Sequence, residues 1–224
     1  LGMGWNQETM KEGRMPTRED MDRISTEIPV CMLRTCAHIA ACNTVMLERI
    51  RELKNVDPET ISHVDFINGL LREDAMRLYM DVIPKADDAY VRELIEIGQR
   101  DLNAAGITCV HSDDLKVIAG MDPIHLIDLF REMEEEGKLT VRVYEQCLVD
   151  QPDFGRLLAA RSDPDDRTSL FRTGPRKLLQ DGSLGAKSAE MIDGYVDDRS
   201  NHGIPIYTEE ELYSWIKAAH DQHM

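Results

Sequence analysis

Short apolar runs alternate with longer amphipathic runs from about residue 107 onward. The short runs, at 107–111, 139–144 and 177–179, predict three strands. Between them, residues 123–136 and 154–160 place their apolar side chains on one helical face and predict helices. Because a helix follows a strand each time, the pattern predicts βα units with parallel strands.

The first part of the chain follows a different pattern. A Gly- and Pro-punctuated start leads into an apolar run at 29–33, which predicts a strand. The helical runs there and just after it are 44–53, 70–82 and 89–105. Gly106 is a natural C-cap for the last of these helices. We therefore divide the chain into an α+β segment over 1–85 and βα units over 86–224.

Composition narrows the class of protein. With 224 residues and 42% hydrophobic content, the chain can bury a large core. It contains no apolar run of about 18 residues and no signal-peptide pattern, so we expect a cytoplasmic protein with no membrane partner. Its 5 cysteines lack CxxC spacing, which favours reduced thiols. The formal net charge of −16 would repel a phosphate backbone, so nucleic acid is excluded as a partner.

Lys177 is the first candidate for chemistry. It stands where a parallel strand should emerge at its carboxyl end, which is the functional face of a barrel. A buried ammonium must be paired, lose its proton or be modified, because desolvation disfavours the charged form. The spacing alone leaves three roles open: an ordinary ion pair, a Schiff base with a carbonyl substrate, and a carbamate that bridges metal ions.

The loop Asp181-Gly182-Ser183-Leu184-Gly185 follows at once. Its two glycines permit positive φ, and its small side chains let backbone N–H groups approach a ligand closely. The spacing matches neither a P-loop nor a dinucleotide-binding turn. A plain tight turn at a strand end explains the Asp-Gly step equally well.

Three further polar positions stand at predicted element ends. His111 closes a predicted strand before Ser112-Asp113-Asp114, and suits either a metal ligand or base, or a satisfied strand-end histidine. His38 and Asn43 flank small residues, and Asn43 is expected to cap the helix that follows. Glu73 lies early in a predicted helix, where a carboxylate suits the helix dipole.

Several motifs, in order along the chain, resemble the amidohydrolase 3 family of the metal-dependent amidohydrolase superfamily. The motifs are Gly13-Arg14-Met15-Pro16-Thr17-Arg18, His38 with Asn43, Asn68-Gly69-Leu70-Leu71 with Glu73, the runs 106–111 and 139–144, and Lys177 with 181–185. Together they span nearly the whole chain. The resemblance implies an α/β fold, namely a partial (β/α)8 TIM barrel of the metal-dependent hydrolase type. Residues 1–85 would be an inserted α+β segment, and 86–224 would supply about strands 2 to 4.

The resemblance also implies a centre of divalent metal ions, zinc foremost, at the carboxyl mouth of the barrel. Lys177 falls where the family carries a bridging carboxylated lysine or carboxylate, and a carbamate there would be an anionic oxygen donor. The implied reaction is metal-dependent hydrolysis of C–N bonds other than peptide bonds in small amide-type molecules. The residues implied to border the substrate are His38, Asn43, Glu73, His111, Asp181, Gly182, Ser183 and Gly185.

The chain departs from the family pattern in what it lacks. It contains no H-x-H motif, and it ends before the expected fifth strand and before the eighth-strand aspartate that usually serves as general base. We therefore expect an internal fragment that is inactive alone, because one ligand cannot hold a binuclear site. Lys187 and Ser188 stand where the family commonly has arginine and threonine.

Two alternatives to the hydrolase remain. An aldolase-like barrel would use Lys177 as a Schiff-base nucleophile, which borohydride would trap in the presence of substrate. A non-catalytic interaction module would assemble with itself through exposed strand edges, which light scattering would detect.

Overall fold

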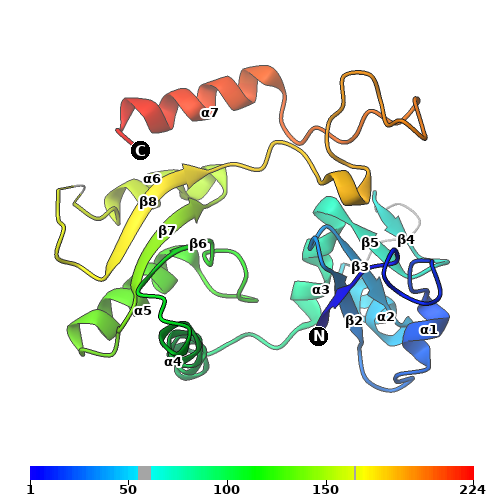
Figure 1. Ribbon diagram of the computed structural model, residues 1–224, viewed down its shortest axis with the longest axis horizontal. Coiled ribbons are helices and arrows are strands. Elements are labelled where there is room, and N and C mark those ends of the chain that lie inside the picture. Colours follow the sequence, from blue (N-terminus) through cyan, green and yellow to red (C-terminus); the bar gives the residue numbers. More distant parts are fainter. Residues whose placement is uncertain (55–61, 164) are drawn as a thin grey trace. The chain divides into compact units, whose positions relative to one another are not determined.

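The computed structural model describes residues 1–54, 62–163 and 165–224 (Figure 1). The chain forms two compact units. The first unit contains Leu1–Ile83 and Leu179–Glu209, and the second contains Pro84–Leu178 and Glu210–Met224. Each unit combines helices with a sheet, so the α/β class is confirmed. Within the described residues, no helix has both the length and the apolar character that a membrane span requires.

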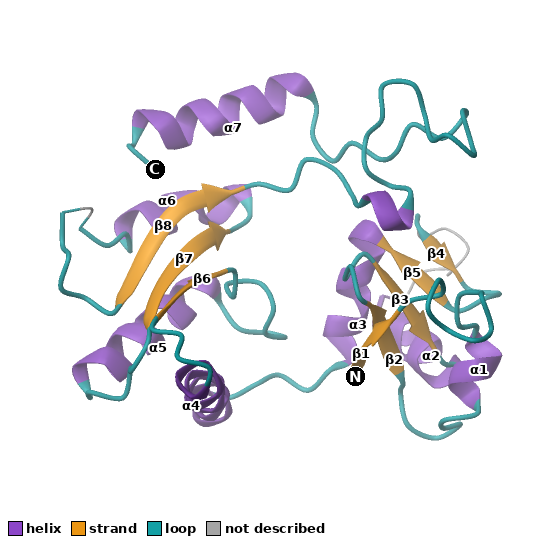
Figure 2. Cartoon of the chain, viewed as in Figure 1, coloured by secondary structure: helices purple, strands orange, loops and turns teal. Residues whose placement is uncertain are grey.

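A five-stranded mixed sheet organises the first unit, in the order β1-β2-β3-β5-β4 (Figure 2). The strands are β1 (Gly2–Trp5), β2 (Cys31–Arg34), β3 (Ile39–Cys42), β4 (Val64–Asp65) and β5 (Leu70–Arg72). The β1–β2 pair is parallel and the other pairs are antiparallel. Strand β3 is buried throughout, because its alternate residues enter two different apolar clusters on the two faces of the sheet.

Helices cover both faces of this sheet. The helices are α1 (Arg18–Asp22), α2 (Thr44–Lys54) and α3 (Arg77–Val82), with a 3-10 turn η2 (Glu73–Met76). Met46, Leu47 and Ile50 of α2 pack in the cluster that contains Ala40 and Cys42. Met21 of α1 packs in the cluster on the opposite face. Burying these apolar side chains stabilises the unit by roughly 1.5–3 kcal/mol for each large one.

The predicted helix at 70–82 is wrong in its first half. Leu70 and Leu71 pair with Ala41 and Ala40 in the antiparallel β3–β5 ladder. Glu73 then takes φ +47, which ends the strand and turns the chain into η2. An apolar run of this length fits either a strand or a helix, and the pairing with β3 decides between them.

The second unit contains a three-stranded parallel sheet in the order β6-β7-β8. The strands are β6 (Cys109–Ser112), β7 (Arg142–Leu148) and β8 (Phe171–Lys177), and the helices are α4 (Asp88–Ala104), α5 (Pro123–Glu135), α6 (Phe154–Ala159) and α7 (Glu209–Asp221). Two further 3-10 turns are η3 (Gln151–Asp153) in this unit and η4 (Leu184–Ala186) in the first. Strand and helix alternate as predicted, and Gly106 ends α4 at φ +73.

The predicted strand at 177–179 is displaced along the chain. Strand β8 ends at Lys177 instead of beginning there. Its sequence is polar and contains Gly174 and Pro175, so it lacks an apolar strand pattern. Pairing with β7 holds it in the sheet, with an extra residue in β8 because Glu145 and Cys147 oppose Thr173 and Arg176.

One face of the parallel sheet packs on helices. Val143, Cys147 and Phe171 join the cluster built by the apolar face of α5, and the rings of Phe130 and Phe171 stack with centroids 4.7 Å apart. Alternation along β7 therefore directs Tyr144 and Leu148 to the opposite face.

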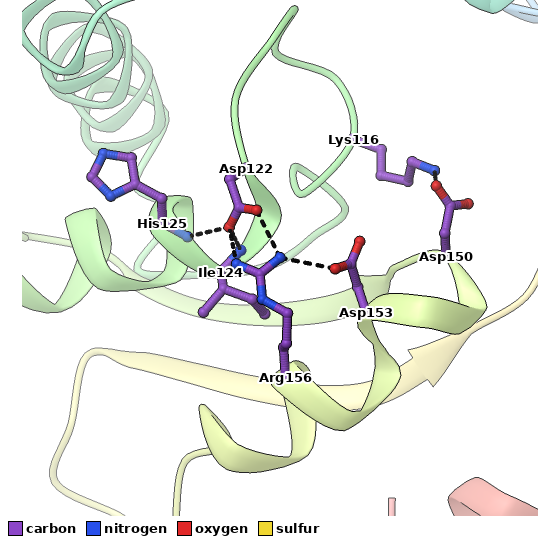
Figure 3. Close-up of polar contacts among 7 residues, drawn as sticks. All are labelled: Lys116, Asp122, Ile124, His125, Asp150, Asp153 and Arg156. Atoms are coloured by element: carbon purple, nitrogen blue, oxygen red, sulfur yellow. Dashed lines mark hydrogen bonds and ion pairs between the residues drawn. The ribbon is translucent and has the colours of Figure 1, made fainter.

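Ion pairs join the starts of α5 and α6 (Figure 3). Asp122 caps α5 by accepting from the N–H groups of Ile124 and His125. Arg156 of α6 donates to Asp122 Oδ2 at 2.8 Å and Oδ1 at 2.9 Å, and to Asp153 Oδ1 at 2.8 Å. This guanidinium, with the capping N–H groups, holds the pKa of Asp122 below its usual value. The carboxylate of Asp122 thus contacts both the first turn of α5 and a side chain of α6.

The division of the chain differs from the predicted one in one segment. The first boundary falls between 83 and 84, near the predicted residue 85. Residues 179–209, which the sequence pattern assigned to the barrel portion, belong to the first unit. The predicted loop 181–185 therefore lies in the first unit, and Lys177 lies in the second.

Candidate functional site

Lys177 is the last residue of β8, at the carboxyl end of the parallel sheet. It pairs in register with Leu148 of β7, so it lies on the sheet face opposite the helix-covered one. Its ammonium forms an ion pair with Asp113 Oδ2, from the loop after β6. The two side chains retain 29% and 34% of their exposure, so the pair is reachable by solvent.

His111 lies on the same face of the sheet. It pairs in register with Tyr144, and the two rings lie 5.2 Å apart between centroids at an angle of 54°. Tyr144 and Leu148 share one face of β7, so the neighbours of that face, His111 and Lys177, share it too. The sheet face opposite the one that packs on α5 thus carries His111, Tyr144 and the Lys177–Asp113 pair.

Sequence reasoning missed Glu145, a fully buried carboxylate on β7. Its Oε1 accepts from the N–H of Asp114 at 2.9 Å. Its Oε2 and Asp113 Oδ1 are buried with no hydrogen-bond partner in the described part of the chain. Burial raises the pKa of Glu145 to about 7, with the nearby Asp114 and Asp113 charges adding to the rise. Its place between Val143 and Cys147 in an alternating strand is the sequence signal that would have found it.

Hydrogen bonds join the side chains of His38, Glu73 and Ser188 in the first unit. His38 Nδ1 lies 2.8 Å from Glu73 Oε2, and the hydroxyl of Ser188 donates to Glu73 Oε1. The side chain of Glu73 is 7% exposed and that of His38 is 30% exposed. Sequence reasoning singled out His38 and Glu73 but gave Ser188 no role, because no local pattern shows a contact 115 residues apart.

The predicted glycine loop folds against these residues. A Cβ on Gly182 would lie 2.2 Å from Ser188 Oγ, and one on Gly185 would lie 3.0 Å from Arg34 Nη1. Neither glycine is among those with positive φ, so close approach and not backbone handedness requires them. Ser183 receives Ala186 N–H on its hydroxyl, and Asp181 Oδ2 accepts from Glu190 N–H at 2.9 Å.

Asn43 is fully buried, and its side-chain amide is satisfied within the first unit. Its Oδ1 accepts from the N–H groups of Val30 and Met46, both at 2.9 Å. Its Nδ2 donates to the carbonyls of Ser25 and Ile28, both at 2.8 Å. The contact with Met46 is that of a helix N-cap. These contacts give Asn43 the role of a structural link between the α1–β2 connection and α2.

The described residues do not form a metal site by themselves. Within them, no group of three or more His, Cys, Asp and Glu side chains is placed to hold a metal ion. The buried, unpaired Asp113 Oδ1 is an oxygen donor suited to a hard cation, whereas the ammonium of Lys177 is not. The pair would therefore fit a divalent cation only with Lys177 converted to an anionic form.

The similarity to known proteins extends over the whole chain. Residues 1–224 match the model of the amidohydrolase family. A Bacillus subtilis (strain 168) protein named as an amidohydrolase, YtcJ, is 27% identical over 229 residues, covering 100% of this chain and 42% of that protein. Protein LONG AFTER FAR-RED 3 of Arabidopsis thaliana is 26% identical, covering 98% of this chain and 39% of its own length.

Solved structures give the same result. The crystal structure of an uncharacterized metal-dependent hydrolase from Pyrococcus horikoshii OT3 has a TM-score of 0.66 and 25% identity, covering 100% of this chain and 42% of that one. A counterpart from Pyrococcus furiosus has a TM-score of 0.62 and 26% identity, covering 98% of this chain and 43% of that one. The chain spans about two fifths of the length of these relatives.

Proposed function

Because this chain belongs to the amidohydrolase family, we propose that it is one part of a metal-dependent enzyme that hydrolyses C–N bonds other than peptide bonds in small amide-type molecules. The names of the similar proteins, an amidohydrolase and two metal-dependent hydrolases, support a hydrolase. The exposed edges of a three-stranded sheet support the view that this part is inactive without further strands.

In this proposal β6, β7 and β8 are strands 2 to 4 of a (β/α)8 barrel. The parallel order and the helix after each strand support it. The face that carries His111, Tyr144 and Lys177 would be the barrel interior, since the helices cover the opposite face.

The observation that carries the proposal is the position of Lys177 at the carboxyl end of β8, on the sheet face opposite the one that packs on α5. A carbamate on its amine would replace the ammonium by an anionic oxygen donor beside Asp113. Two anions side by side repel, and divalent cations between them, zinc foremost, would compensate that repulsion. A metal ion bound there would polarise the carbonyl group of the substrate and lower the pKa of a bound water molecule.

The residues proposed to border the substrate lie in both units. They are His111 in the second unit, and His38, Glu73, Asp181, Gly182, Ser183 and Gly185 in the first. Asn43 enters the proposal only as the link that fixes the segment before α2, because its amide has no hydrogen-bonding position left for a ligand.

The test begins with the coding sequence that flanks this chain, followed by metal analysis of its full-length product. We expect an upstream H-x-H motif, downstream strand-end histidines and bound divalent metal. A Lys177→Arg variant keeps a cation for Asp113 but cannot form a carbamate, so it should lose most of the metal. Flanks without these histidines, or full metal content in Lys177→Arg, would contradict the proposal.

A Schiff-base reaction at Lys177 remains the alternative for the same amine. The ion pair with Asp113 does not decide between the two, because carbamate formation and Schiff-base formation both require the neutral amine of Lys177. Borohydride reduction with a carbonyl substrate would leave a mass increase on Lys177 if this alternative held. Self-association through the free edges of β6 and β8 is a separate proposal for the isolated chain, and light scattering that shows a monomer would contradict it.

A further inference from the structure

His38 and Glu73 are cross-strand neighbours just beyond the end of a ladder. Ile39 of β3 pairs with Arg72 of β5, so the next position brings His38 opposite Glu73. The N–H of Glu73 donates to the carbonyl of His38 at 3.0 Å, which continues the ladder by one bond. Their side chains therefore lie side by side, and the 2.8 Å contact between Nδ1 and Oε2 follows from that register.

The donor and the acceptor can be assigned for each hydrogen bond that joins Ser188, Glu73 and His38. Ser188 Oγ accepts from the N–H of Ser183 at 3.1 Å, and its own hydrogen is donated to Glu73 Oε1, which lies much nearer than the other possible acceptor, the carbonyl of Ser183 at 3.5 Å. A carboxylate accepts only, so its second oxygen takes the hydrogen of His38 Nδ1. In the neutral imidazole this contact selects the tautomer with Nδ1–H, in which Nε2 carries no hydrogen.

Backbone strain accompanies this arrangement. Glu73 takes φ +47 and Ala37, just before His38, takes φ +60, both in the left-handed region that disfavours side chains. Such conformations cost on the order of 1 kcal/mol each and concentrate at functional sites. At Glu73 the turn places the carboxylate beside His38. At Ala37 the turn reverses the chain between β2 and β3, so that β3 begins at Ile39.

We propose that Ser188 and Glu73 are positioning residues that hold His38 with Nε2 free to accept a hydrogen bond from an N–H group of the substrate. The 30% exposure of the His38 side chain leaves part of the ring open to a ligand. This inference rests on the proposed function and narrows its substrates to amide-type molecules that retain an N–H. Fully N-alkylated analogues lack the donor and are rejected.

The experiment needs no metal and no turnover. In the 15N-labelled chain at alkaline pH, two-bond 1H–15N spectra distinguish the two tautomers of each neutral histidine. We expect His38 with Nδ1 protonated. His125 is the internal control, because its Nε2 lies 2.8 Å from Asp88 Oδ1 and should carry the hydrogen instead.

Titration with two probes then tests the ligand class. We expect acetamide to shift the Nε2 resonance of His38 at concentrations about tenfold below those needed for N,N-dimethylacetamide. His125 should respond equally to both probes. A His38 resonance in the Nε2–H form, or equal responses of His38 to the two probes, would overturn the inference.

Variants separate positioning from folding. Glu73→Gln keeps one acceptor and should mix the two tautomers of His38, and Ser188→Ala should do so more weakly. Ser188→Thr restores the hydroxyl and should restore the single tautomer. If these changes leave the tautomer of His38 unaltered, the positioning role is wrong. The two proposals fail separately. If the full-length protein hydrolyses no amide-type molecule, the proposed function is wrong, whereas the spectra of His38 still test its tautomer.

Discussion

Lys177 and Asp113 form an ion pair from the carboxyl ends of β8 and β6, strands that β7 separates in the sheet. The pair therefore links the outer strands across the middle one. Both partners are about one third exposed, and water screens such charges strongly. Its contribution to the free energy of unfolding should therefore be small.

A double-mutant cycle measures that contribution. We expect Lys177→Met, Asp113→Asn and the double variant to give a coupling free energy of at most about 1 kcal/mol in urea unfolding. A coupling above about 3 kcal/mol would mean that the pair is desolvated, as a purely structural ion pair would be.

Glu145 should make stability depend on pH. Its folded pKa of about 7 lies above the usual value of 4.5, so the folded state binds a proton more tightly than the unfolded state. The contribution of Glu145 to the free energy of unfolding is then fully present below about pH 4.5 and is lost as pH rises through about 7. Glu145→Gln keeps an acceptor for Asp114 N–H and removes the charge, so it should be more stable than wild type at pH 8 by up to about 3 kcal/mol.

The pH series also contains its own check. The difference between the two proteins should become constant as pH falls below 4.5, since wild-type Glu145 is then protonated in both the folded and the unfolded state. Glu145→Leu lacks the acceptor for Asp114 N–H and should be less stable than Glu145→Gln at every pH. A constant difference between wild type and Glu145→Gln from about pH 4.5 to about pH 8 would show that the carboxyl group has an ordinary pKa.

Cys36 should be the most reactive of the thiols at neutral pH. Burial raises the pKa of Cys36, but hydrogen bonds from His38 N–H, Arg34 and Ser183 outweigh it and hold the pKa below its usual value. Burial raises the pKa of Cys147 to about 12. Iodoacetamide at pH 7, followed by peptide mass spectrometry, should label Cys36 first and leave Cys147 unlabelled.

The exposed Cys109 serves as the comparison for that experiment. Arg34→Gln removes the guanidinium beside Cys36 and should slow labelling of Cys36 severalfold, with no change at Cys109. Faster labelling of Cys109 than of Cys36 in the wild type would show that access and not thiolate stabilisation governs these thiols.

Gly182→Ala should destabilise the first unit. The new Cβ would lie 2.2 Å from Ser188 Oγ and 3.0 Å from Glu73 Oε1, so the loop must move. We expect a loss of about 1–3 kcal/mol in the free energy of unfolding, measured by urea denaturation. The matched control is Gly155→Ala in α6, where no atom lies within 4 Å of the new Cβ and the helix should gain about 0.5–1 kcal/mol. A neutral Gly182→Ala would mean that the loop does not pack on Ser188.

Local sequence signals predicted some helices closely, others not, and the contacts of the candidate site only in part. The helix predicted at 123–136 is confirmed as Pro123–Glu135, because Asp122 and Pro123 mark its start and its apolar face is regular. Strand β8 was displaced because Thr173 to Arg176 have no apolar alternation, and only the ladder with β7 makes them a strand. Propensity is a weak guide where pairing decides.

Long-range contacts explain the residues that were missed. Ser188 acquires its role from Glu73, which is 115 positions away, and nothing near Ser188 in the sequence indicates that contact. His38 and Glu73 were named from the family resemblance, whereas their direct contact follows from the register of β3 and β5. The pattern of a single sequence does not contain that register.

The covalent path of the chain passes between the two units at 83–84, 178–179 and 209–210. Ser188 is therefore synthesised after every strand of the parallel sheet, although its partner Glu73 precedes that sheet. When synthesis has just completed β8, Glu73 can contact His38 but Ser188 has not yet been added to the chain. The contact between Glu73 and Ser188 can therefore form only after synthesis of the segment 179–209 has reached Ser188.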